Sequence, residues 1–282
     1  MLKFEQISDS VWAHTEGDTF GHVAFIKLEK STVFIDSGYF PKIIKQAKEE
    51  AEKITSLPVR YLIISHHHAD HIFGNQFFED CEIISTKDTV DFLENLIKTR
   101  WTDEYIENFK KENSEEFDIL KITLPNKTFE GEFEIKEGDK YLKIIQTDGH
   151  TKGSCFVYVP DESIIIAGDL LFSEEIPYFG DTTADPYLWV EAYQTMIGLS
   201  PIKIIPGHGP VTDVKQIELQ LQYLKQCIKW MEKFIKSGGN KEDLDDAEDF
   251  PMLDYELYDN FDTLFKMSKE RTFDVVKERI TN

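Results

Sequence analysis

The sequence of 282 residues predicts an α/β protein in which two sheets meet face to face and a helical segment extends the C-terminus. Short apolar runs of strand length alternate with amphipathic helical stretches along most of the chain. The order strand, turn, helix, strand and polar loop occurs twice, first around Asp36 and again around Asp169, without a residue-level repeat. The chain is 41% hydrophobic and contains 21 Phe, which is enough for a sizeable core.

In the first half, Pro41 begins an amphipathic helix. Ile43, Ala47, Ala51 and Ile54 recur at helical spacing, with Lys and Glu between them. Pro58 then ends this unit, and the run VRYLIIS that follows has the apolar character of a buried strand. The other elements expected here are strands at Val23–Leu28, Thr32–Asp36, Val59–Ser65 and Cys81–Ser85, and charged helical residues 87–112.

In the second half, strand-like stretches near 119–135 lead into a further series of alternating elements. These are strands at Tyr141–Gln146, Cys155–Val159, Ser163–Ala167 and Ile202–Ile205, a helix at about 186–198, and a long helix from about Asp213 to Lys236. Ser237–Gly239 and the acidic run Glu242–Asp249 mark a break. After it, Phe261–Ile280 is expected to form a helical tail that carries no recognisable chemistry.

The charge balance excludes some partners. Lys and Arg number 31 against 53 Asp and Glu, a formal net charge of −22, which opposes binding to phosphate backbones and anionic lipids. No apolar run reaches the length of a membrane span, and Met1–Ser10 lacks the apolar core of a signal peptide. Cys81, Cys155 and Cys227 each lie in an apolar stretch, which predicts buried free thiols and a reducing, cytoplasmic setting.

The densest chemical signal is the run Ser-His-His-His-Ala-Asp-His, which directly follows a buried strand. Four of the eight histidines of the chain fall within six positions of this run. Side chains two apart in an extended segment point the same way, so His66 and His68 can grip one cation together. Asp70 and His71 are then free to turn toward a second cation. Imidazole suits zinc, iron and similar metals, and a carboxylate adds neutralising charge.

Three later segments place further ligand types at strand ends. His150 lies in Asp-Gly-His-Thr, Asp169 ends the run IIIAGD, and His208 lies in Pro-Gly-His-Gly-Pro. Taken singly, each also has an ordinary structural explanation, as a core or surface histidine or a turn aspartate. Their shared position after strands, together with the histidine run, predicts one metal site.

In this order, the four motifs resemble the ligand signature of the metallo-β-lactamase superfamily, over roughly residues 5–225. The resemblance implies a four-layer αββα sandwich with the site at one edge of its two sheets. It implies a catalytic domain over residues 1–236, followed by an acidic linker and helical tail over residues 237–282. It also implies that Asp36, in FIDSG, supports the metal loop from behind.

The resemblance further implies two divalent ions, zinc first, with iron or manganese as alternatives. His66, His68 and His150 would hold the first ion, Asp70, His71 and His208 the second, and Asp169 both. The implied enzyme is a dinuclear hydrolase that cleaves a small ester, lactone or thioester by attack of a bridging hydroxide. Asp70 or Asp169 would relay the proton to the leaving group.

Several alternatives stay open. A hydroxyacylglutathione hydrolase of the glyoxalase II type shares the histidine pattern, but the Arg-Phe-Phe-Glu-Gly segment of that enzyme is not present. A persulfide dioxygenase would need one iron and an open coordination face. A nuclease is opposed by the acidic charge, and a non-catalytic binding protein would not need a complete ligand set. A small-molecule substrate is expected, and a homodimer is one option for the assembly.

Other residues near the motifs have two interpretations. His67 stands at a non-ligand position, where it would line the pocket or face solvent. Thr151 and Ser154 follow the candidate ligand His150 closely in the sequence and are equally consistent with structural and functional roles. Lys152 is the nearby cation that could hold a substrate carboxylate. Core packing is the first expectation for the aromatic residues that follow Asp169, with pocket lining as the alternative: Tyr178, Phe179, Tyr187 and Trp189.

Overall fold

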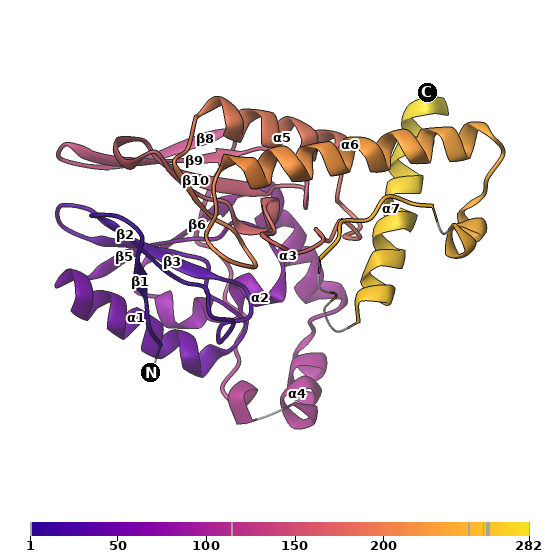
Figure 1. The fold of residues 1–282 in the computed structure, drawn as a ribbon. Helices are drawn as coiled ribbons and strands as arrows, with labels where there is room; N and C mark the ends of the chain where they lie inside the picture. The colour runs from indigo at the N-terminus through magenta and orange to yellow at the C-terminus, as the bar shows by residue number, and fades with distance from the viewer. Residues whose placement is uncertain (1, 114, 248, 256, 258–259, 282) are drawn as a thin grey trace.

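The computed structural model describes residues 2–113, 115–247, 249–255, 257 and 260–281 (Figure 1). Residues 248, 256 and 258–259 of the predicted acidic linker lie outside the described residues, as do the two terminal residues of the chain. Among the described residues, no helix has the length and apolar character needed to cross a membrane.

Twelve strands among the described residues form two sheets. The first sheet is antiparallel from β1 to β4 and parallel from β4 to β7. Its strands are β1 (Glu5–Gln6), β2 (Val11–His14), β3 (Val23–Lys27), β4 (Thr32–Ile35), β5 (Val59–Ile63), β6 (Glu82–Thr86) and β7 (Lys127–Phe129). The second sheet has the order β12-β11-β10-β9-β8, and only its β11–β12 pair is parallel. Its strands are β8 (Glu132–Glu137), β9 (Lys140–Gln146), β10 (Cys155–Val159), β11 (Ile164–Ile166) and β12 (Lys203–Ile205).

Helices cover the outer face of each sheet, as Figure 1 shows. The described helices are α1 (Pro41–Thr55), α2 (Ala69–Ile72), α3 (Lys87–Thr99), α4 (Asp103–Glu112), α5 (Pro186–Gly198), α6 (Val214–Lys236) and α7 (Phe261–Thr281). One apolar cluster joins α1 and α3 to the first sheet, a second lies between the sheets, and a third joins α5, α6 and α7 to the second sheet. These three interfaces define four layers, so the predicted αββα sandwich is confirmed.

Strand alternation explains how each sheet serves two interfaces. Val33 and Ile35 of β4 belong to the cluster between the sheets, while Phe34 between them packs toward α1. In β10, Val157 faces the first sheet and Phe156 faces the helices on the other side. Because successive side chains of a strand point to opposite faces, a wholly apolar strand needs cover on both.

The register of α1 differs from the prediction. The buried positions include Ile44, Ala47 and Ala51, whereas Ile43 is only half-buried and Ile54 is exposed. The helix does begin at Pro41, as predicted. The prediction of Ile54 on the buried face was wrong. The buried positions of this helix follow one another at spacings of three and four residues and end at Thr55.

Two other expectations need correction. Residues 119–126 are not a strand, although Ile122 and Leu124 lie at strand-like spacing. These side chains pack against the first sheet from an irregular segment, and the paired strands begin only at β7. Conversely, β1 (Glu5–Gln6) and β2 (Val11–His14) are strands that the sequence pattern did not predict. Pairing with β3 explains β2, a tertiary effect that local composition does not report.

The C-terminal segment packs onto the second sheet's helical layer. Phe250, Phe261, Phe273 and Val276 belong to the same cluster as Trp189 of α5. The helical tail is therefore confirmed as α7, which lies against α6 (Figure 1). The division of the chain at residue 237 into domain and tail stays a prediction.

Candidate metal centre

The histidine run changes conformation at His68, and this change distributes its side chains. Residue 68 is still extended (φ −70°, ψ 149°), and α2 begins at the next residue. His66 and His68 therefore point the same way, with ring centroids 4.7 Å apart, as the extended spacing predicts. The first helical turn then carries Asp70 and His71 to a neighbouring position.

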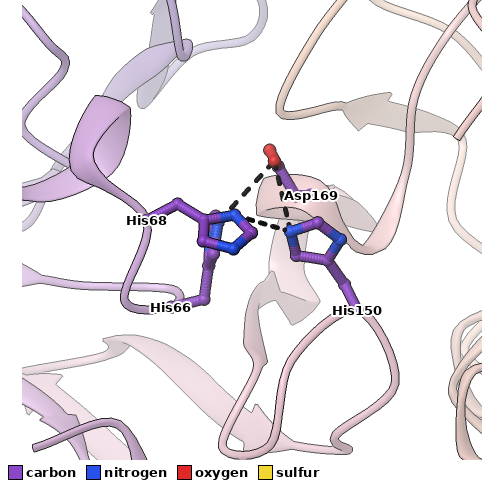
Figure 2. A group of neighbouring side chains, drawn as sticks. All are labelled: His66, His68, His150 and Asp169. Atoms are coloured by element: carbon purple, nitrogen blue, oxygen red, sulfur yellow. Dashed lines mark hydrogen bonds and ion pairs between the residues drawn. The ribbon is translucent and has the colours of Figure 1, made fainter. Parts of the chain in front are cut away.

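All seven predicted ligand residues come together in two adjoining groups. Group one is His66, His68, His150 and Asp169, drawn in Figure 2, and group two is Asp70, His71, Asp169 and His208. In each group the candidate ligand atoms lie within 4.8 Å of one another. They come from the loop after β5, the loop after β9, the end of β11 and the loop after β12.

Asp169 belongs to both groups because its two oxygens face in different directions. Oδ2 lies 3.6 Å from Nε2 of His66 and 3.5 Å from Nε2 of His150. Oδ1 lies 3.0 Å from Nε2 of His71 and 3.4 Å from Nε2 of His208. One carboxylate oxygen is thus presented to each group.

Within the described part of the chain, three buried polar atoms of these groups have no hydrogen-bond partner: His66 Nε2, His71 Nε2 and Asp169 Oδ1. A buried polar atom without a partner costs about 1–3 kcal/mol, so such atoms call for an explanation. All three atoms are of types that bind divalent metals, and each faces its own group. The donor set therefore fits two metal ions.

Asp36 holds histidines of both groups from behind. Ser65 Oγ donates to Asp36 Oδ2 at 2.7 Å, so the hydroxyl can accept from His66 Nδ1 at 3.0 Å. His71 Nδ1 donates to the same carboxylate oxygen at 2.9 Å. In both rings Nδ1 then carries the proton and Nε2 is left free to ligate. Asp36 adopts φ 55°, a left-handed conformation that non-glycine residues rarely take.

Two glycines allow close approach of the backbone to the candidate ligands. A Cβ at Gly207 would lie 1.9 Å from Asp169 Oδ1, and one at Gly21 would lie 2.8 Å from His71 Nε2. Neither position has room for a side chain beside these atoms. The Pro-Gly-His-Gly motif thus needs its first glycine for contact with Asp169.

The electrostatics of the two groups differ. Burial lowers the pKa of His150 to about 3, despite Asp169 beside it. Burial alone would also lower the pKa of His208, but Asp169 and Asp70 outweigh it and raise that pKa to about 10. Burial opposes the same carboxylates at His71, whose pKa is raised well above its usual value. A metal ion entering group two must therefore displace protons, whereas the group-one imidazole of His150 is already neutral.

The structure excludes one of the two interpretations of His67, which does not face solvent: its ring is buried and stacks on Phe92 with centroids 3.8 Å apart. Lys152 forms an ion pair with Asp88 at 2.8 Å, and its role toward a substrate carboxylate stays a prediction. Thr151 and Ser154 are buried and hydrogen-bond to each other, a structural role.

The aromatic residues after Asp169 separate into core and site. Phe179 and Trp189 are fully buried, so Trp189 backs His150 from the core and does not wall the pocket. Tyr178 is half-buried, with its ring centroid 6.2 Å from those of both His68 and His150. Phe20 is 59% exposed and approaches His208 edge-on at 5.8 Å. Phe20 and Tyr178 thus present aromatic surface beside the two groups.

Asp181 is a site residue that the sequence analysis missed. Its Oδ2 accepts from His68 Nε2 at 3.2 Å and from His67 Nε2 at 3.3 Å. Burial alone would raise the pKa of Asp181, but these hydrogen bonds hold it well below its usual range. The sequence held one indirect indication: a ligating histidine needs an acceptor for its other ring nitrogen, and an aspartate can supply it.

The fold and the ligand order have parallels among known proteins. A family model described as the Metallo-beta-lactamase superfamily matches residues 17–208. The Metallo-beta-lactamase type 2 of Bacillus sp. (strain 170) is 28% identical over 237 residues, which cover 79% of this chain and 82% of that protein. The Beta-lactamase-like protein 2 homolog of Caenorhabditis elegans is 26% identical over 182 residues, 64% of this chain, which spans about half (52%) of that relative.

A shorter match and a solved structure complete the comparison. The hydroxyacylglutathione hydrolase of Brucella ovis is 27% identical over 113 residues, 40% of this chain and 34% of that protein. A metallo-β-lactamase from Pontibacter korlensis superposes with a TM-score of 0.63 at 22% identity, covering 80% of this chain and 99% of that one. At this identity the likeness shows the fold alone.

Proposed function

Because the chain belongs to the metallo-β-lactamase superfamily, we propose that it is a metal-dependent hydrolase that cleaves a small ester, lactone or thioester. The observation that carries the proposal is the convergence of seven donor side chains on two groups that share Asp169. Four separate segments of the chain supply these side chains, whereas a chance cluster of surface histidines would come from a single segment.

The proposal includes two divalent ions, with zinc as the first expectation and iron or manganese as alternatives. Group one and group two would hold one ion each, with Asp169 common to both. Mixed imidazole and carboxylate donors are typical of zinc sites, and buried Nε2 atoms without a partner support binding at both groups. When bound, such ions polarise a carbonyl oxygen and lower the pKa of water.

A carboxylate of the protein would transfer the proton of the attacking water to the leaving group. Asp70 and Asp169 both lie among the candidate ligands, but their side chains are 15% and 5% exposed, respectively. Asp70 is therefore the better placed of the two to take a proton from the attacking water. It can then pass the proton to the leaving group, which departs toward solvent.

The surroundings favour a small and largely apolar acyl or ring substrate. Phe20 and Tyr178 offer aromatic surface beside the metal groups, and Lys152 is already paired with Asp88. The net charge of −22 would repel polyanions, so we propose no nucleic acid and no membrane partner. The three cysteines are free and buried, as predicted, which supports a reducing, cytoplasmic setting.

A hydroxyacylglutathione hydrolase is the second candidate, supported by the similarity to the Brucella ovis protein. That match covers only 40% of this chain. A glutathione thioester also carries several charges, and Lys152 is the one nearby cation in the sequence that could hold a single carboxylate of it. The pairing of Lys152 with Asp88 therefore argues for the less charged substrates.

The test combines metal analysis with a substrate panel. Purified protein should contain about two transition-metal ions per chain, since seven donors exceed what one tetrahedral ion uses. A lactone, a simple thioester, a glutathione thioester, a β-lactam and single-stranded RNA are then assayed side by side. We expect turnover of the lactone or simple thioester that a chelator abolishes and added Zn²⁺ restores. Exclusive cleavage of the glutathione thioester would move the protein to the second candidate.

Two further outcomes would overturn the proposal. Turnover of RNA far above the carbonyl substrates would identify a nuclease. Oxygen consumption with a persulfide, by protein that holds a single iron, would identify a dioxygenase. In both assays the Asp169→Ala variant serves as the control for contaminating activity, because it removes the carboxylate shared by both groups.

A further inference from the structure

The 178–185 loop (residues 178–185, between β11 and α5) contacts two histidines of group one on their outer sides. The backbone oxygen of Tyr178 accepts from His150 Nδ1 at 3.0 Å. The carboxylate of Asp181 accepts from His68 Nε2 at 3.2 Å. The structure records no such contact from this loop to a ring of group two among the described residues. The loop therefore touches one metal group only.

These contacts decide which ring nitrogens are free. His68 Nδ1 and His150 Nε2 lie 3.0 Å apart and are drawn facing each other in Figure 2. For both to ligate one ion, the opposite nitrogen of each ring must carry the proton and find an acceptor. Tyr178 supplies that acceptor for His150, and Asp181 supplies it for His68.

Helix α7 fixes this loop along its length. The backbone N–H of Phe179 donates to Ser268 Oγ at 3.1 Å, and Arg271 Nε donates to the oxygen of Ala184 at 2.7 Å. A Cβ added to Gly180 would lie 2.6 Å from Met267 Cβ, so the loop backbone rests directly on the helix. All of these α7 residues lie beyond residues 17–208, the part matched by the superfamily.

A further ion pair closes the end of the loop. Asp185 Oδ2 lies 2.9 Å from Arg279 Nη2, and Asp185 also caps α5. Asp181 itself is held within the loop, since its other oxygen accepts from the backbone N–H of Thr183 at 2.7 Å. The carboxylate that meets His68 thus has little freedom to turn away.

We propose that Asp181 is a positioning residue for His68 and that α7, acting through the 178–185 loop, sets the metal affinity of group one. The inference rests on the proposed metal-binding function. It assigns a role in the site to the helical tail, which carries no ligand. Group two is held instead through Asp36 and is expected to be independent of α7.

The test measures Co²⁺ and Zn²⁺ binding directly, without a substrate. Each variant is stripped of metal and titrated with Co²⁺ in competition with a chromogenic chelator, while the visible spectrum is recorded. Asp181→Ala should weaken one of the two ions by roughly 10- to 100-fold and leave the other within about two-fold. His68→Ala, which removes the ligand itself, gives the reference, because the absorption band weakened in Asp181→Ala should be the one lost in His68→Ala.

Two variants grade the effect. Asp181→Asn keeps one acceptor oxygen, which must serve either Thr183 or His68, so its loss of affinity should be intermediate. Arg271→Ala removes the α7 contact to Ala184 and should weaken the same ion to a smaller extent. Lys277→Ala removes the same charge from an exposed position of α7 and should change neither ion.

Asp185→Asn keeps a helix cap, because asparagine also caps helices, but it weakens the ion pair to Arg279 and should therefore weaken the same ion slightly. Metal affinities unchanged in Asp181→Ala would overturn the inference. So would loss of a third bound ion in that variant, because Asp181 would then be a ligand; His67, His68 and Asp181 do lie close enough for one. These results do not depend on hydrolysis: wild-type protein that binds two ions but cleaves no substrate would instead refute the proposed function.

Discussion

At the scale of single residues, two histidines near group one, His67 and His150, differ in what they contribute. His150 presents Nε2 to group one, whereas His67 stacks on Phe92 and hydrogen-bonds to Asp181. We expect His150→Ala to reduce kcat/KM by orders of magnitude and His67→Ala to have a much milder effect. Asp169→Ala should resemble His150→Ala. Equal losses from His67→Ala and His150→Ala, in steady-state assays of metal-loaded protein, would mean that the ligand assignment is wrong.

Asp36 touches no candidate ligand atom yet supports both groups. Replacing it with alanine removes the acceptor for His71 Nδ1 and for Ser65, which in turn holds His66. Metal affinity should fall by roughly 10-fold, measured by chelator competition. Asp36→Asn keeps one acceptor oxygen, so its metal affinity should lie between those of Asp36→Ala and the wild-type protein. Affinity that stays unchanged in Asp36→Ala would reduce Asp36 to a turn residue.

The ligand residues could be predicted from the sequence, whereas one of their supports could not. His66, His68, Asp70 and His71 stand together after a strand, so their spacing alone suggests metal binding. Asp181 has no such spacing. It reaches His68 only because the 178–185 loop folds back over group one and rests on α7, an arrangement of distant segments. Ligation by the seven predicted residues itself stays a prediction.

At the scale of elements, most strands and helices agree with the sequence pattern, and the errors have physical causes. Strongly apolar runs such as β3 and β10 are buried on both faces, so their pattern is unambiguous. Residues 119–126 have the apolar spacing of a strand because some of their side chains pack against the first sheet, but the strand ladder with β6 begins only at Lys127. Periodicity reports burial, but it does not report hydrogen bonding between strands.

The corrected register of α1 leads to a prediction at this scale. Ile44 is fully buried against the first sheet, whereas Ile54, on the same helix, is 36% exposed. Ile44→Ala should lower the free energy of unfolding by about 2–5 kcal/mol, because it leaves a cavity. Ile54→Ala, the matched control, should change it by less than about 1 kcal/mol. Urea denaturation followed by circular dichroism measures both, and the reverse order would restore the originally predicted register.

At the scale of the whole molecule, the metal groups join the two halves of the sandwich. Asp70 and His71 follow a strand of the first sheet, while His150, Asp169 and His208 follow strands of the second. Two facing sheets were predicted from the order of elements, and the four-layer sandwich from the resemblance of the ligand motifs to the superfamily. The sequence did not predict whether the tail packs into the apolar cluster of α5 and α6, because the acidic break before α7 is equally typical of a tail that extends away from the fold.

Removing metal should therefore destabilise the entire fold. An ion that binds only the folded state stabilises it by about 4 kcal/mol when present at about 1,000 times its dissociation constant. Chelator-treated protein should melt at a clearly lower temperature in differential scanning calorimetry, and Zn²⁺ should restore the original value. The Asp169→Ala variant should show little response to either treatment. A chelator effect of equal size in that variant would place the stabilising ion elsewhere.

The spread of the ligands along the chain also bears on biosynthesis. A ribosome releases the histidine run long before His208, which follows β12, the last strand of either sheet. Group one is complete once Asp169 has emerged, but group two must wait for His208, and the 178–185 loop must wait longer still for α7. Until then, a nascent chain offers cations an incomplete group two and a group one that lacks the support of the loop. Metal capture then becomes a late event of maturation, one that only a finished and folded chain can complete.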